Sequence, residues 1–236
     1  ISLVRLKTSK QDGMSKVLLY AYGAYKHSVS PSFSASRFCL VDRGIIFAIA
    51  HIRGGGDLGD NWHEEGKKKL KKNTFLDYIA CANHLIEQRY THKGGLCFYG
   101  GSAGGLTGGS VANMAPELFF AMLLLVPFVD TMTTMLNEKL PLTPAEWELW
   151  GNPIKSKEYF DYILSYSPYN NLSKKKYPPM LITSSIFDNR VLYSEPVKYI
   201  AKLRDVKEDD NEQLLKCKMK AAGHGGMSGR DNAIKE

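Results

Sequence analysis

Short apolar runs alternate with longer amphipathic stretches along most of the chain. Five runs of four to six uncharged residues are typical of strands buried on both faces of a parallel sheet. They cover 17–20, 45–50, 96–99, 122–126 and 180–183. A further strand is predicted over 214–219, where apolar and polar residues are mixed.

Helical periodicity appears between these runs, most clearly over 75–88. Its apolar positions are Phe75, Tyr78, Ile79, Ala82, Leu85 and Ile86. A second helix is predicted over 196–204. Strands that alternate with helices indicate an α/β fold with a mostly parallel central sheet flanked by helices. The 236 residues fit one domain over 1–236.

The most informative turn follows the third of these runs. Residues 100–105 read Gly-Gly-Ser-Ala-Gly-Gly directly after the predicted strand 96–99. The Gly-x-Ser-x-Gly pattern is typical of a strained strand-to-helix turn that exposes the serine hydroxyl at the end of a sheet. Small neighbours are needed because a β-carbon beside the serine would crowd the turn. Ser102 is therefore a candidate nucleophile.

Two further residues complete a candidate catalytic set. Asp188 follows the predicted strand 180–183, and His224 follows the predicted strand 214–219. A serine needs a base to remove its proton, and a carboxylate holds the histidine in the right tautomer. The order Ser102, Asp188, His224 is that of the α/β-hydrolase fold. Taken singly, each has an ordinary alternative: a turn serine, a turn cap and a loop histidine.

A tetrahedral intermediate also needs hydrogen-bond donors for its oxyanion. The backbone N–H of Ala103, at the start of the predicted helix, is one candidate. The segment 19–25 follows a strand, where the second donor is expected. From position alone, that donor is either a backbone amide or a tyrosine hydroxyl.

Charge and cysteine usage exclude some classes of function. Lys and Arg number 31 against 24 Asp and Glu, but the excess is concentrated in the runs 67–72 and 174–176, which we interpret as solvated loops. No aromatic residue lies within these runs, so we expect no nucleic-acid partner.

The four cysteines form no metal or disulfide pattern, which favours a reducing, cytoplasmic setting. The longest apolar run, 118–129, is too short to cross a bilayer and is interrupted by Pro127, so we expect no membrane association. We also expect no cofactor and no metal.

Several longer motifs resemble the prolyl oligopeptidase family of serine peptidases. They cover 51–63, 72–77, 100–106, 113–119, 126–130, 141–143 and 166–169. Within the family, the stretch 142–153 is most similar to the oligopeptidase B branch. That resemblance implies an α/β-hydrolase catalytic domain acting on short basic peptides.

The same resemblance implies that Glu146 and Glu148 line a pocket that selects Arg or Lys before the scissile bond. Two carboxylates in a dry pocket are costly unless a cation pairs with them, and a guanidinium can take both. The alternative is a pair of exposed charges on a short helix. Residues two apart do not share a helical face, so the pair converges only if the segment is irregular.

Two more roles are carried over from the family. Tyr22 matches the tyrosine whose hydroxyl joins the oxyanion hole. Arg190 matches an arginine that binds a substrate backbone carbonyl in prolyl oligopeptidase. The alternative for Arg190 is a structural ion pair with a nearby carboxylate.

The chain also departs from the family. A seven-bladed β-propeller and an extreme N-terminal segment are absent, and the chain ends 12 residues after His224, where the family has a closing helix. We therefore expect a catalytic domain truncated at both ends, with a β-propeller domain in the full-length protein. Lys26 also stands where oligopeptidase B has a glycine.

The sequence thus predicts a serine endopeptidase that hydrolyses short peptides after Arg or Lys. One alternative is a prolyl-specific peptidase or an esterase of the same fold. Another is a catalytically inactive fragment or interaction-only remnant. Nucleic-acid binding through the lysine runs is a third and more distant possibility.

Overall fold

The computed structural model describes residues 1–219 and 223–226, and within them one seven-stranded sheet forms the centre of the molecule. The strands are β1 (Ser2–Val4), β2 (Val17–Tyr20), β3 (Ile46–Ile49), β4 (Leu96–Gly101), β5 (Phe119–Leu125), β6 (Met180–Ser185) and β7 (Gln213–Lys218). Their spatial order is β1-β3-β2-β4-β5-β6-β7. Only β1 runs antiparallel to its neighbour, and the other neighbouring strands are parallel. All six predicted strands are confirmed.

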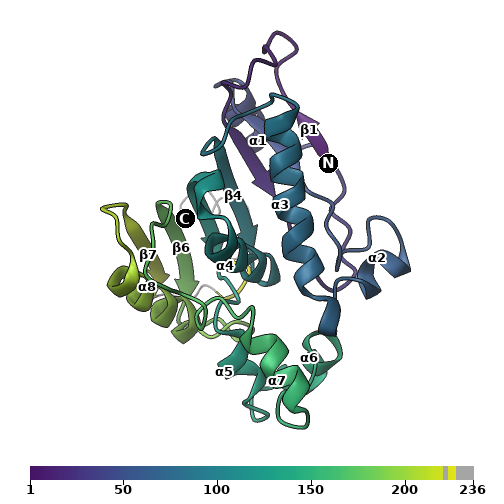
Figure 1. The fold of residues 1–236 in the computed structure, drawn as a ribbon, viewed down its shortest axis with the longest axis vertical. Helices are drawn as coiled ribbons and strands as arrows, with labels where there is room; N and C mark the ends of the chain where they lie inside the picture. The colour runs from purple at the N-terminus through teal and green to yellow at the C-terminus, as the bar shows by residue number, and fades with distance from the viewer. Residues whose placement is uncertain (220–222, 227–236) are drawn as a thin grey trace.

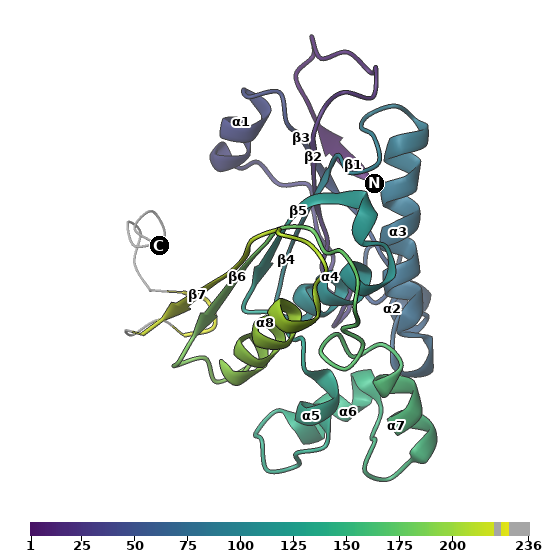
Figure 2. The ribbon, with the colours of Figure 1, turned by 60° about the vertical axis from the view of Figure 1, so that its left-hand side comes forward.

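Helices cover both faces of this sheet. The α-helices are α1 (Ala35–Val41), α2 (Asp60–Glu64), α3 (Lys72–Glu87), α4 (Ala103–Met114), α5 (Thr131–Met135), α6 (Thr143–Trp150), α7 (Lys157–Leu164) and α8 (Ser194–Val206). Two 3-10 turns, η1 (Lys68–Leu70) and η2 (Pro116–Leu118), precede α3 and β5. Figure 2 shows α1 on one side of the sheet and α3, α4 and α8 on the other. The predicted α/β-hydrolase fold class is therefore confirmed.

The core lies between the parallel strands and the helices α3 and α4. Leu19, Phe98 and Met122 on the strands are completely buried, as is Tyr78 on α3. The Tyr78 ring lies 5.1 Å from that of Phe98, and its hydroxyl donates to the carbonyl of Leu19 at 3.1 Å. The predicted apolar face of 75–88 thus packs on the sheet, because its period of 3.6 residues places those side chains on one stripe.

Three short helices stand apart from the layers. Figure 1 shows α5, α6 and α7 grouped beyond one end of the sheet, within the connection from β5 to β6. The carboxyl ends of parallel strands meet at the same edge of a sheet, so the turns after β4, β6 and β7 gather at one edge. The candidate residues Ser102, Asp188 and His224 follow these three strands.

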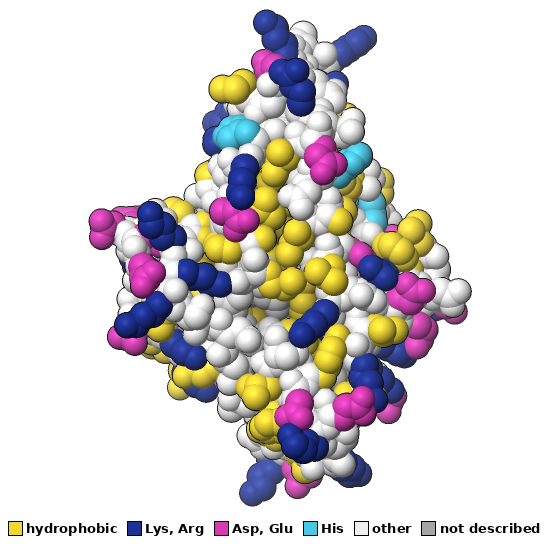
Figure 3. All heavy atoms as spheres, viewed as in Figure 1, with side chains coloured by type: hydrophobic (Ala, Val, Ile, Leu, Met, Phe, Trp, Pro, Cys, Tyr) yellow, Lys and Arg dark blue, Asp and Glu magenta, His cyan; other side chains and the backbone are white. Residues whose placement is uncertain are grey.

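The surface seen in Figure 3 has an uneven distribution of side chains. Apolar side chains gather in the middle of the face that α3 and α4 cover, and side chains of both charges alternate toward its rim. Over the described residues, no helix is both long enough and apolar enough to span a membrane.

Candidate active site

Ser102 occupies a strained turn between β4 and α4. Its φ of 53° and ψ of −121° lie in a region that L-residues with a side chain rarely adopt. Two hydrogen bonds hold this conformation: the Ser102 N–H donates to the carbonyl of Leu125 at 2.9 Å, and the Phe128 N–H donates to the Ser102 carbonyl at 3.0 Å. The turn therefore has the geometry that the Gly-x-Ser-x-Gly pattern predicts.

Small residues let α4 begin close to its neighbours. A β-carbon on Gly104 would lie 2.8 Å from the carbonyl oxygen of Ala21, directly before Tyr22. One on Gly105 would lie 2.3 Å from the Pro127 side chain. Replacing either glycine would push the start of α4 away from the segment that carries Tyr22. As the first residue of the helix, Ala103 has no intrahelical acceptor for its N–H.

His224 and Asp188 form a hydrogen-bonded pair. The distance from His224 Nδ1 to Asp188 Oδ2 is 2.7 Å, and Asp188 is buried. Asp188 Oδ1 accepts from the backbone N–H groups of Arg190 at 2.9 Å and Val191 at 3.0 Å. Burial alone would raise the pKa of the Asp188 carboxyl, but the bonds from His224 and the two amides outweigh it and hold the pKa below its ordinary value. With Nδ1 engaged, Nε2 of His224 is left to act as a base.

Ser102 and His224 line the same cavity, of about 580 Å³, together with Tyr22 and Arg190. Among the described residues no direct hydrogen bond joins Ser102 to His224; such bonds often tighten only when substrate is bound. Burial raises the pKa of the Tyr22 hydroxyl, and its hydrogen bond with Ser102 opposes that shift. The Tyr22 hydroxyl thus stays protonated near neutral pH and lies beside the serine.

A larger cavity, of about 840 Å³, opens from the same serine. Its wall includes Phe128, Tyr25 and the carboxylate of Glu146. Glu146 Oε2 accepts from the Tyr25 hydroxyl at 2.9 Å and from Nε1–H of Trp150 at 2.6 Å. Burial raises the pKa of Glu146 above its ordinary value, although both bonds act in the opposite direction. Neither bond uses Oε1, so that oxygen keeps its lone pairs for another partner.

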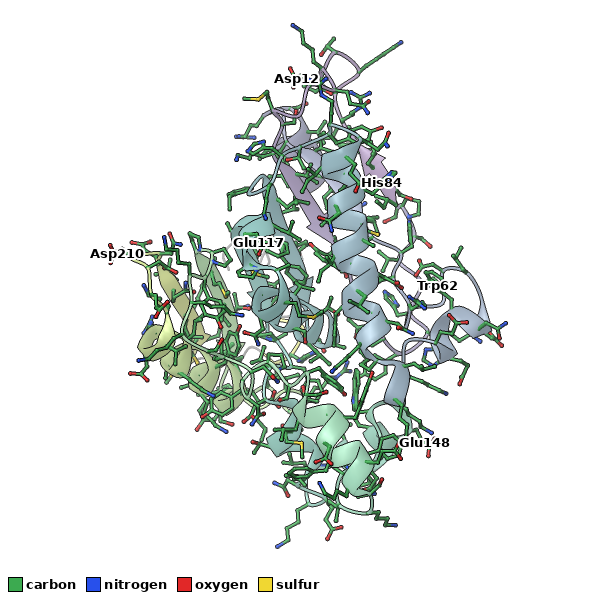
Figure 4. All side chains as sticks on the ribbon, in the orientation of Figure 1. Asp12, Trp62, His84, Glu117, Glu148 and Asp210 are labelled. Atoms are coloured by element: carbon green, nitrogen blue, oxygen red, sulfur yellow. The ribbon has the colours of Figure 1, made fainter. Side chains whose placement is uncertain are left out.

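The structure separates the two glutamates that were expected to share a pocket. Helix α6 is regular from Thr143 to Trp150, so residues two apart point in different directions. Glu148 is 85% exposed and pairs with Lys68 at 3.1 Å. Figure 4 shows Glu148 at the outer edge of the molecule. The prediction that both glutamates line one pocket is therefore wrong: Glu146 lines the cavity and Glu148 does not.

The other two carried-over residues, Tyr22 and Arg190, line the cavity that contains Ser102. Arg190 lines both cavities, and within the described ranges it forms no ion pair, so the structural alternative for its side chain finds no support. Lys26 has a φ of 57°, a conformation that favours glycine. An ion pair with Asp60 at 2.5 Å accompanies this conformation.

Sequence reasoning missed three polar or ionisable groups around these cavities. Two of them are the partners of Glu146: Trp150, which is buried, and Tyr25, which is 41% exposed. Glu195 is 3% exposed, lies in the first turn of α8, and accepts hydrogen bonds from the Asp130 N–H at 2.9 Å and the Thr134 hydroxyl at 2.5 Å. Nothing in the local pattern distinguishes Glu195 from an exposed helix-start glutamate.

The fourth residue that was missed is Lys71, which is 1% exposed. The run 67–72 was interpreted as a solvated loop, and that interpretation is wrong for this position. Lys71 stands four residues before Phe75 and seven before Tyr78, so extending the apolar stripe of α3 backward would have found it.

Within the described part of the chain, no three His, Cys, Asp or Glu side chains gather in a way that could hold a metal ion.

Comparison with known proteins identifies relatives along the whole chain. Protease 2 of Moraxella lacunata is 48% identical over 236 residues, which cover 100% of this chain and 34% of that protein. Dipeptidyl aminopeptidase BI of Pseudoxanthomonas mexicana is 46% identical over the same length and 32% of that protein is covered. The chain thus spans about a third of the length of these curated relatives.

A solved structure gives the same result. Oligopeptidase B from Leishmania major superposes with a TM-score of 0.91 and 47% identity, over 94% of this chain and 31% of that one. The sequence profile of the prolyl oligopeptidase family matches residues 31–236. This match takes in Ser102, Asp188 and His224 with the turns that carry them, and the chain belongs to the prolyl oligopeptidase family.

Proposed function

We propose that the chain is the catalytic domain of a serine endopeptidase that hydrolyses short peptides after Arg or Lys. One observation carries the proposal. Ser102 stands on a strained turn at the start of α4 and shares a cavity with His224, whose Nδ1 is bonded to buried Asp188. A nucleophile, a base and an orienting carboxylate in this relation are the parts that acyl transfer requires.

The reaction follows from these positions. His224 Nε2 takes the proton from the Ser102 hydroxyl as Oγ attacks the carbonyl carbon of the scissile bond. The C–N bond then breaks, the proton passes from His224 to the leaving amine, and the acyl group remains on Ser102 as an ester. Water, deprotonated by His224, attacks the ester and regenerates the hydroxyl. Asp188 stays ionised and stabilises the imidazolium that forms twice in this cycle.

Two donors serve the oxyanion in this proposal. The Ala103 N–H has no acceptor within α4, and the Tyr22 hydroxyl lies beside Ser102. Donors fixed in place before the charge develops need no reorganisation during the reaction, which makes them effective. The short contacts around Gly104 support this role, since they bring the start of α4 against the segment of Tyr22.

Glu146 is the specificity residue that we assign to the larger cavity. Among the described residues no cation pairs with this half-buried carboxylate, whose pKa burial raises, and a substrate guanidinium or ammonium would supply one. The free Oε1 is available for that contact. Arg190, between the two cavities, would bind a backbone carbonyl of the substrate. Glu148 has no place in this pocket.

The remaining two thirds of the relatives' length bears on access to the site. We expect a β-propeller in the full-length protein, which would restrict the cavities to short peptides. Buried Cys97, with a thiol pKa raised to about 12 by burial, behaves as a small hydrophobe.

A substrate panel tests the proposal. Peptides with Arg, Lys, Pro or Ala before the scissile bond, and a simple ester, are compared on the full-length protein. Because one relative is named a dipeptidyl aminopeptidase, each peptide is supplied with a free and with a blocked amino terminus. We expect Arg and Lys peptides to have the highest kcat/KM.

Matched variants sharpen the panel. Glu146→Gln should lower kcat/KM for the Arg peptide by about a hundredfold or more, because a desolvated charge pair is lost. Glu148→Gln, the control two residues away on the exposed face, should change it by less than about twofold. Preferred cleavage after Pro, or of the ester alone, would replace this proposal with the prolyl peptidase or esterase alternative. No turnover by folded protein would favour the inactive fragment.

A further inference from the structure

Lys71 is a buried lysine between the loop that carries Tyr22 and the helix that carries Glu146. Its side chain is 1% exposed, and its Nζ donates to the carbonyl of Gly23 at 2.6 Å and to the hydroxyl of Thr74 at 3.0 Å. The rings of Trp150 and Phe75 lie 5.1 and 5.9 Å from Nζ. Among the described residues no carboxylate pairs with it. Burying a lysine without a carboxylate partner is costly for the fold.

The neighbouring lysines show the contrast. Lys67, Lys68 and Lys69 each pair with a carboxylate at the surface. Burial lowers the pKa of Lys71 to about 7, so its ammonium and amine forms coexist near neutral pH. Nζ can donate to the carbonyl and the hydroxyl in either form, and neither bond requires a counter-ion. Of the five lysines in the run 67–72, three thus form surface ion pairs, whereas Lys71 makes internal contacts, which we call the tether.

One end of the tether is the loop that carries Tyr22. Gly23 follows Tyr22 directly and has a φ of 76°, in the region where only glycine moves freely. Because glycine has a wide range of allowed φ and ψ angles, its backbone conformation is fixed only when other groups bind it. The bond from Lys71 fixes the Gly23 carbonyl, and with it the peptide unit between Gly23 and Ala24, one residue beyond Tyr22.

The other end is the helix that carries Glu146. The Trp150 ring, which lies against the ammonium, is 1% exposed, and its Nε1–H donates to Glu146 at 2.6 Å. Attraction between an ammonium and an aromatic face strengthens when both are desolvated. Lys71 therefore contacts both the loop of the oxyanion donor and the ring that holds the specificity carboxylate.

We propose that Lys71 is a positioning residue whose ammonium, bonded to the Gly23 carbonyl and packed on Trp150, fixes Tyr22 relative to Glu146. This inference rests on the proposed function, since it assigns how that site is held. It predicts that the oxyanion hole and the specificity pocket are coupled. A substrate held by Glu146 is presented to Tyr22 at the right distance only while this tether is in place.

The test replaces the ammonium while keeping the length of the side chain. In the full-length protein, Lys71→Met should lower kcat for the Arg peptide by about tenfold to a hundredfold, the scale of a small misplacement at the reacting centre. KM should change by less than about threefold. Lys69→Met, an exposed lysine in the same run, is the matched control and should match the unsubstituted protein. Activities are expressed per active site titrated with a fluorophosphonate, so loss of folded protein does not enter.

A double-variant cycle reports the coupling. The loss from Lys71→Met with Glu146→Gln should be at least fivefold smaller than the product of the two single losses. A purely structural lysine would lower the melting temperature and leave kcat per titrated site, and the additivity of the two variants, unchanged.

If Lys71→Met does not fold, Thr74→Val serves instead, because it keeps the charge and removes one of its two oxygen partners. It should lower kcat about threefold or more. Turnover equal to that of Lys69→Met in the folded variant overturns the inference alone. No turnover by the unsubstituted protein overturns the proposed function, and the inference with it.

Discussion

Two regions of the molecule bring a serine, a histidine and an aspartate together. The first is the Ser102 site, with Asp188 and His224. The second, which we call the β1 cluster, consists of Ser2, His51 and Asp57. In the β1 cluster the Ser2 hydroxyl lies 2.8 Å from His51 Nε2, and His51 Nδ1 lies 2.9 Å from Asp57 Oδ1. Its hydrogen bonds follow the order expected of a catalytic relay, and it borders a cavity of about 640 Å³.

The backbone distinguishes the two regions. Ser2 lies in an extended edge strand whose register partner is Ile49. Ser102 lies on a left-handed turn directly before a helix, where the N–H of Ala103 has no intrahelical acceptor. Only the Ser102 site pairs a projecting hydroxyl with a backbone donor for an oxyanion.

The β1 cluster fits a structural role. Its hydrogen bonds join β1 to the segment that follows β3, and Asp57 also accepts from the Val29 N–H at 2.9 Å. Hydrogen bonds among serine, histidine and aspartate therefore do not by themselves define a hydrolase. The strained turn and the start of the helix do, because they supply exposure and charge stabilisation that side chains alone do not.

The largest expected effect tests this distinction directly. Ser102→Ala should lower kcat for the Arg peptide by about a millionfold, because nucleophile, base and carboxylate act as a unit. Ser2→Ala should leave kcat within about twofold. Fluorophosphonate labelling followed by peptide mass spectrometry locates the modified serine in each protein.

Labelling of Ser2 in the Ser102→Ala variant would contradict the expectation that only Ser102 is reactive. It would mean that an extended strand presents a reactive hydroxyl without a strained turn. Labelling of Ser102 in both the unsubstituted and Ser2→Ala proteins, with none in Ser102→Ala, would support a reactive Ser102 and a structural Ser2.

The carboxylates offer a smaller effect. Asp188→Asn should lower kcat about ten-thousandfold, since an amide favours the wrong histidine tautomer. Asp57→Asn should leave kcat within about twofold and lower the free energy of unfolding by about 1 kcal/mol, because its partly buried hydrogen bonds weaken. Steady-state kinetics and denaturant unfolding on both variants measure the two quantities. Similar kcat losses in the two variants would contradict a purely structural β1 cluster.

Much of the fold could be predicted from the sequence, because its signals are local. The apolar runs that became β2 to β6 carry their own evidence of burial on both faces, and the stripe through Phe75 and Tyr78 carries that of α3. The three-residue strand β1 has no such signal. Its place in the sheet depends on pairing with residues more than 40 positions away.

The site shows the same division. The strained turn at Ser102 could be predicted because adjacent glycines encode it, and so could the positions of Asp188 and His224 after two predicted strands. The orientation of Glu148 could not, since a two-residue spacing gives different directions in a helix and in an irregular segment. Lys71 was missed because a run of like charges usually marks a solvated face, and burial there depends on tertiary contacts with Gly23 and Trp150.

The two regions also differ in how deeply they bury ionisable groups. His51 and Asp57 keep side-chain exposures of 20% and 10%, whereas Glu195, which lines the larger cavity beside Ser102, is 3% exposed. Burial is the main cause that raises the pKa of Glu195 to about 7, although hydrogen bonds from Thr134 and the Asp130 N–H oppose it. The facing charged groups are Asp130 and Lys198, which pair with each other.

The pH dependence of stability should therefore reside on the Ser102 side of the molecule. A carboxyl whose pKa is raised on folding binds more protons in the folded protein than in the unfolded chain, where its pKa is about 4.3. Its stabilising contribution is complete below that value and is lost as the pH rises to about 7. The unsubstituted protein should lose about 3 kcal/mol relative to Glu195→Gln across this window. Guanidinium unfolding of both proteins at pH 4.5, 5.5, 6.5 and 7.5 measures the difference, and parallel curves would show that Glu195 stays ionised despite its burial.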